Sequence, residues 1–173
     1  MMTTRAATAA AAPEKLALAP LFSDQMVLQR EQPLPIWGQA APGSVVKLHL
    51  LDDQGVTITS ASGEVMADGN GDWQITLPAL PAAGPLQMVV TTDRQQITLK
   101  DVWLGDVWLA SGQSNMEWTV AISANAEAEI AAAKYPGIRH IKVPLVASPI
   151  VMDGARAASP LAPPRVMPRA RLQ

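Results

Sequence analysis

The chain has 173 residues, of which 49% are hydrophobic and 16% charged, and its formal net charge is −2. This weak acidity without a basic domain argues against a nucleic-acid partner, and no apolar run approaches the roughly 18 residues of a membrane span. Cysteine is absent, which rules out disulfides, thiolate zinc sites and a cysteine nucleophile. The length suits one domain or one small domain followed by part of another, and the patterns along the chain favour the second arrangement.

Residues 1–18 are predicted to form a flexible leader. They contain one arginine followed mainly by alanine and threonine. A secretory signal has a core of about 7 to 15 strongly apolar residues, which this stretch lacks. The sequence therefore indicates no convincing signal peptide, and the compartment stays open.

Residues 19–104 are predicted to form an all-β sandwich. Short apolar runs alternate with turn residues at regular intervals, which is typical of this architecture. The alternation is clearest at Val46, Leu48 and Leu50, which share one face of a strand. The expected strands cover residues 26–29, 34–38, 45–51, 56–66, 73–77, 86–92 and 95–99.

Aspartate-rich turns at residues 52–55 and 68–72 separate some of these strands. The second turn superficially resembles a calcium loop, but it lacks the spacing and the terminal glutamate of an EF-hand. Aspartate, asparagine and glycine are also the usual residues of tight turns. We therefore predict turns and no metal site.

Residues 105–145 are predicted to begin a second, α/β domain. Residues 107–110 form a continuous apolar run typical of a buried parallel strand. A helix is expected at 124–134, with glutamates in its first turn and Lys134 in its last, and a second strand at 138–143. The expected unit of strand, helix and strand is the smallest piece of a parallel sheet. The following residues 146–173, rich in proline, alanine and arginine, are predicted to be a disordered tail.

Ser114 is the main candidate for chemistry. It follows the turn at Gly112, where a serine can serve as a nucleophile. The same serine, with Glu117 three residues later, also fits a capping box, in which the two side chains bond backbone amides at a helix start. Both interpretations stay open, because unpaired amides at a helix start can also stabilise an oxyanion.

Several motifs occur together in one order along the chain. They are Leu-Phe-Ser-Asp-Gln-Met-Val-Leu-Gln-Arg at 21–30, Pro-Ile-Trp-Gly at 35–38, Ala-Pro-Gly at 41–43, Asp-Gly-Asn-Gly-Asp-Trp at 68–73, and Gly-Asp-Val-Trp-Leu-Ala-Ser-Gly-Gln-Ser-Asn-Met-Glu-Trp at 105–118. Together they resemble the sialate O-acetylesterase family. The resemblance covers roughly residues 20–145 and implies a β-sandwich attached to an SGNH-type hydrolase domain of flavodoxin-like fold.

The resemblance also implies a mechanism. Ser114 is expected to be the nucleophile and its backbone amide an oxyanion donor, with Gln113, Asn115 and Trp118 lining the pocket. The implied reaction hydrolyses an acetyl ester of a sialic acid or a related O-acetylated sugar through an acetyl-enzyme, without metal or organic cofactor. A periplasmic or secreted location would fit the family. Protein partners and the oligomeric state stay open.

The family's catalytic acid, its histidine and its other oxyanion donors come from later segments, which are not recognised in this sequence. His49 and His140 are the chain's two histidines, and both are predicted to be structural or solvated. We therefore expect the chain to be inactive alone. Alternatives are a noncatalytic carbohydrate-binding sandwich and a truncated product without function. The remaining tryptophans are expected in the core: Trp37, Trp73, Trp103 and Trp108.

Overall fold

The computed structural model describes residues 14–142. Most of the expected leader and the whole expected tail lie outside these residues. The described chain forms strands first and short helices afterwards. The elements are β1 (Ala17–Leu18), β2 (Val27–Gln29), β3 (Leu34–Gln39), β4 (Val45–Leu51), β5 (Thr57–Met66), β6 (Asp72–Leu77), β7 (Ala83–Thr91), β8 (Gln96–Gly105), η1 (Ser114–Glu117), η2 (Val120–Ile122) and α1 (Ala126–Ala132).

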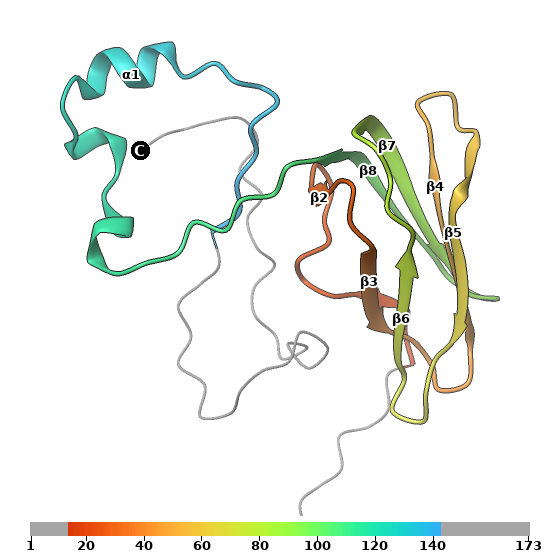
Figure 1. Ribbon diagram of the computed structural model, residues 1–173. Coiled ribbons are helices and arrows are strands. Elements are labelled where there is room, and N and C mark those ends of the chain that lie inside the picture. The colour runs from red at the N-terminus through yellow and green to blue at the C-terminus, as the bar shows by residue number, and fades with distance from the viewer. Residues whose placement is uncertain (1–13, 143–173) are drawn as a thin grey trace, which may run out of the picture.

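The strands are arranged in two sheets, and we call residues 14–105 the β-domain (Figure 1). The smaller sheet has the strand order β1-β3-β6, and the larger has the order β2-β8-β7-β4-β5. Neighbouring strands are antiparallel except β2 and β8, which run parallel. The two-sheet arrangement is compatible with the predicted sandwich, and every predicted strand of residues 19–104 has a counterpart.

One hydrophobic core joins the two sheets. On β4, Val46, Leu48 and Leu50 are at most 1% exposed, as their alternation predicts. The same alternation on β6 buries Trp73 and Leu77. The core therefore draws on both sheets, so residues from distant parts of the sequence stabilise each other through burial of apolar surface.

Two features of the β-domain differ from the sequence prediction. Strand β1 lies within the expected leader: Leu16 is buried beside it, and Leu18 pairs with Gly38. Two residues are too few to show an alternating pattern, which is why the sequence did not reveal this strand. Strand β8 continues to Gly105, beyond its predicted end at residue 99. The sequence prediction stopped too early because a β-bulge near Asp101 interrupts the alternation of apolar and polar residues.

The aspartate turns are confirmed as turns. The Asp52 carboxylate accepts hydrogen bonds from two following backbone N–H groups, and the Asp68 carboxylate does the same. Gly55 and Gly71 in these turns have positive φ angles, which glycine adopts without strain. Within residues 14–142, no three or more histidine, aspartate or glutamate side chains are grouped as metal ligands would be.

We call residues 106–142 the serine segment, and it differs from the predicted unit of strand, helix and strand. Helix α1 lies inside the predicted helix, but neither residues 107–110 nor 138–142 form a strand. A parallel strand needs hydrogen-bonded neighbours and covered faces, whereas Trp108 and Leu109 are 88% and 92% exposed. Figure 1 shows the serine segment as an open loop beside the sheets. No helix in residues 14–142 has the length and apolar character to cross a membrane.

Candidate active site

Ser114 is exposed and is the first residue of the 3-10 helix η1. The turn is closed by the Met116 N–H, which donates to the Gln113 carbonyl at 2.9 Å. Gly112 permits this geometry, because a Cβ there would lie 2.5 Å from Met116 Cγ. The predicted capping box is wrong: Gln113 occupies the cap position, and no side chain caps the helix. A single 3-10 turn places Ser114 inside the helix instead of before it.

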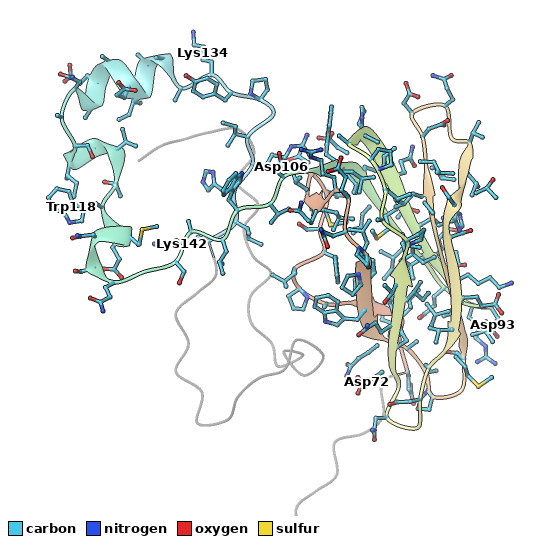
Figure 2. All side chains as sticks on the ribbon, viewed as in Figure 1. Asp72, Asp93, Asp106, Trp118, Lys134 and Lys142 are labelled. Atoms are coloured by element: carbon cyan, nitrogen blue, oxygen red, sulfur yellow. The ribbon has the colours of Figure 1, made fainter. Side chains whose placement is uncertain are left out.

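The expected pocket residues share this turn but do not enclose a pocket. Gln113, Asn115 and Trp118 are all exposed, and Trp118 is 64% exposed. Figure 2 shows Trp118 on the loop away from the sheets. A concavity of about 850 Å³ lies elsewhere, on the β-domain, lined by residues such as Val45. The described residues therefore leave the face around Ser114 open.

Neither histidine is bonded to Ser114. His49 lies in β4, where it pairs with Val89 of β7, and His140 is exposed beyond α1. Among residues 14–142, no side chain donates to or accepts a hydrogen bond from the Ser114 hydroxyl. A serine needs an adjacent base to become an effective nucleophile. The described part of the chain does not provide one.

The tryptophans only partly follow the core prediction. Trp73 is 4% exposed and Trp37 is half-buried, with its ring in an edge-to-face contact with Phe22. Trp103 is 38% exposed, and Trp108 is not in the core at all. An apolar run that belongs to a sheet is buried only where its neighbouring strands are present.

The β-domain holds the start of the serine segment through an ion pair that the sequence does not reveal. Arg30 Nε donates to Asp106 Oδ1 at 2.9 Å, and Arg30 Nη1 lies 2.9 Å from Glu31 Oε1 (Figure 2 labels Asp106). Hydrogen bonding and attraction to Asp106, with a further contribution from Glu31, raise the pKa of Arg30 above its ordinary value. Beside this pair, the Val107 N–H donates to Gln29 Oε1 at 2.9 Å. Arg30 and Asp106 lie in two different sequence motifs, and only the parallel pairing of β2 with β8 brings them together.

Comparison with known proteins identifies the relationship, although no family model matches the chain. It is 33% identical to a sialate O-acetylesterase of Mus musculus over 138 residues, which is 76% of this chain and 25% of the mouse protein. It is 36% identical to the Homo sapiens sialate O-acetylesterase over 128 residues, covering 70% of this chain and 24% of the human protein. The chain thus spans about a quarter of the length of these curated relatives.

A solved structure agrees with the sequence relatives. The crystal structure of a carbohydrate acetylesterase from Xanthomonas citri matches with a TM-score of 0.66 and 38% identity. The match covers 75% of this chain and 28% of the Xanthomonas chain. The sequence matches and the fold match therefore cover most of this chain and agree with each other. The chain belongs to the sialate O-acetylesterase family.

Proposed function

We propose that this chain supplies the nucleophile of a carboxylic ester hydrolase that removes acetyl groups from O-acetylated sugars, with Ser114 as that nucleophile. The observation that carries the proposal is the similarity of about three quarters of the chain to acetylesterases, in sequence and in fold. The exposed position of Ser114 on a turn beyond the β-domain supports it, because an ester can reach the hydroxyl there.

The proposed chemistry uses groups of the polypeptide alone. The Ser114 hydroxyl attacks the acetyl carbonyl and loses its proton to a base, and the carbonyl oxygen becomes an oxyanion. The Ser114 N–H is available to this oxyanion, because the first N–H of a helix has no intrahelical acceptor. The bond between the acetyl carbon and the sugar oxygen then breaks, the sugar oxygen takes the proton back from the base and leaves as a hydroxyl, and water hydrolyses the acetyl-enzyme to acetate and free Ser114.

We propose that the base comes from polypeptide outside residues 14–142, since neither histidine is hydrogen-bonded to Ser114. We propose that residues 105–145 are the first part of an SGNH-type, flavodoxin-like hydrolase domain, and that residues 19–104 are the sandwich attached to it. The exposed apolar side chains of the serine segment support this division, because a completed α/β sheet would cover them. They include Val107, Trp108, Leu109, Ile122, Ile138 and Ile141. Gln113, Asn115 and Trp118 would then line the substrate pocket.

A chimera tests the proposal. Residues 14–142 replace the matching part of the Xanthomonas citri acetylesterase, and acetate release from an O-acetylated sugar and from p-nitrophenyl acetate is measured. The chimera is expected to be active, and Ser114→Ala is expected to lower kcat by at least about 10³-fold. The matched control is Ser111→Ala, an exposed serine three residues earlier, which should keep its activity.

Equal activity of the Ser114→Ala and parent chimeras would overturn the assignment of the nucleophile. The intact chain alone is expected to release negligible acetate, because its described residues offer Ser114 no base. A chimera that folds, binds the sugar and releases no acetate would favour a noncatalytic binding role.

A further inference from the structure

A second polar cluster lies at the far end of the serine segment, around Arg139. Arg139 Nη1 donates to the Asp101 carbonyl oxygen at 2.6 Å, and Nη2 lies 3.1 and 3.0 Å from the two Asp101 carboxylate oxygens. The guanidinium also lies over the Trp103 ring, 5.6 Å from its centre. Arg139 thus contacts a backbone carbonyl, a carboxylate and an aromatic face at once, which suits the planar guanidinium.

The receiving site is built from two residues of strand β8, Asp101 and Trp103. Trp103 Nε1 donates to Asp101 Oδ1 at 2.8 Å, which fixes the carboxylate beside the ring. The pairings of Leu86 with Val102 and of Met88 with Leu99 leave one more residue on β8 than on β7, which is a β-bulge. Asp101 lies in this bulge with a φ of 58°, a left-handed conformation that is unusual for a residue with a side chain.

The opposite strand makes room for the Trp103 ring. A Cβ at Gly84 of β7 would lie 2.5 Å from Trp103 Cδ2, and the φ of Gly84 is 146°, where a side chain is strained. Only glycine therefore lets the indole lie this close to β7. The bulge and the glycine together fix where Asp101 and Trp103 meet the returning chain.

Both ends of the serine segment are held close to strand β8. Arg30 holds Asp106 at the end of β8, and Asp101 holds Arg139 five residues earlier on that strand. At about 3.3 Å per residue, these two attachment points lie no more than about 17 Å apart. Residues 106–139, which include Ser114, are therefore attached to the β-domain at both ends.

We propose that Asp101 and Trp103 form a receptor for Arg139, so that the β-domain holds both ends of the segment that carries Ser114 and positions it. Arg139 is then a positioning residue. Its importance for turnover rests on the proposed function, whereas the attachment itself does not. The side chains of Arg139 and Asp101 are 20% and 40% exposed, whereas those of the ion pair between Arg94 and Asp93 are 87% and 72% exposed. Exposed pairs of that kind contribute little.

Limited proteolysis of the intact chain tests the attachment. Chymotrypsin cuts after aromatic and large apolar residues. Those of residues 107–118 are exposed already, so their cutting rate reports how far the two attachments restrain the backbone from fitting into the protease, not whether the side chains are uncovered. We expect Arg139→Gln to raise the cleavage rate roughly tenfold, because cleavage follows the population of the opened segment. Asp101→Asn should have a similar effect, and combining both changes should add little, since either one alone removes the ion pair.

Two further variants separate positioning from a general charge effect. Arg139→Lys keeps the charge but cannot bind the carboxylate with two nitrogens, so its cleavage rate should fall between those of the parent and of Arg139→Gln. Arg94→Gln removes an exposed pair and should leave the rate unchanged.

Parent-like cleavage of both Arg139→Gln and Asp101→Asn would overturn the proposal, as would equal acceleration by Arg94→Gln. Arg139→Gln should lower the free energy of unfolding of the β-domain by no more than the same tenfold factor, about 1.4 kcal/mol, because Arg139 binds the folded domain only and is not part of its core. None of these results depends on turnover, so the attachment and the proposed ester hydrolysis can fail separately.

Discussion

Gly63→Ala tests the packing of the two sheets against each other. Gly63 lies in β5 of the larger sheet, and a Cβ there would lie 2.5 Å from Ile75 Cγ2 of β6 and 3.9 Å from Leu77 Cδ2. Carbon atoms pack best at about 3.5–4.0 Å, so one of the sheets must move by roughly 1 Å. Ile75 cannot rotate away easily, because its branched Cβ restricts χ1.

The expected cost follows from these distances. Overpacking of a well-packed core costs about 1–3 kcal/mol, and replacing glycine by alanine returns about 0.4–1 kcal/mol by restricting the unfolded chain. Gly63→Ala should therefore lower the free energy of unfolding by roughly 1–2 kcal/mol. A domain of roughly ninety residues has a total of about 5–14 kcal/mol, so this loss is readily measured.

Urea unfolding, followed by tryptophan fluorescence, measures the effect. Gly69→Ala is the matched control: no atom lies within 4 Å of its Cβ position, so its stability should be unchanged or slightly higher. In the background of Ile75→Ala, which removes the clashing methyl group, Gly63→Ala should cost at least about 1 kcal/mol less than in the parent. Equal stabilities of Gly63→Ala and Gly69→Ala would refute the inferred contact between the sheets.

Three further outcomes are expected. Hydrogen bonds from Trp103 and, to a lesser extent, Arg139 hold the pKa of Asp101 below its ordinary value. The attachment of Arg139 is therefore fully present above about pH 4 and is lost as the pH falls through the lowered pKa. Carboxyl NMR should show this pKa rising in Arg139→Gln, and an unchanged pKa would contradict the contact. Asp68→Ala removes the acceptor of two backbone N–H groups and should cost about 1–2 kcal/mol in urea unfolding, whereas a loss near zero would argue against the turn geometry. Ser114→Ala should leave the urea midpoint unchanged, because the side chain is exposed and uncapped; a clear shift would indicate a structural role.

The longer strands of the β-domain could be predicted because the alternation of apolar and polar residues is a local signal, whereas the two-residue strand β1 is too short to show one. The alternation at Val46, Leu48 and Leu50 reports directly which face of β4 is buried. The end of β8 could not be predicted, since the bulge at Asp101 shifts the alternation by one residue. A bulge depends on the pairing with β7, which is not visible in the local sequence.

The candidate site also has a part that the sequence predicts and a part that it does not. Ser114 stands out in the sequence because its neighbours form a recognisable motif. The contact between Arg139 and Asp101 joins residues 38 apart and depends on how the chain returns to β8. The apolar run around Trp108 was predicted to be a strand from its composition alone, but a strand also requires a neighbour with which to pair.

The central claim is that Ser114 carries the acetyl group during ester hydrolysis, with its base supplied from outside residues 14–142. Peptide mass spectrometry after a rapid acid quench tests this most directly. In the active chimera, turning over an acetyl ester, the claim predicts an acetylated peptide that contains Ser114, absent from Ser114→Ala and from the intact chain alone. Acetylation of another residue in the working chimera, or turnover by the Ser114→Ala chimera, would contradict it.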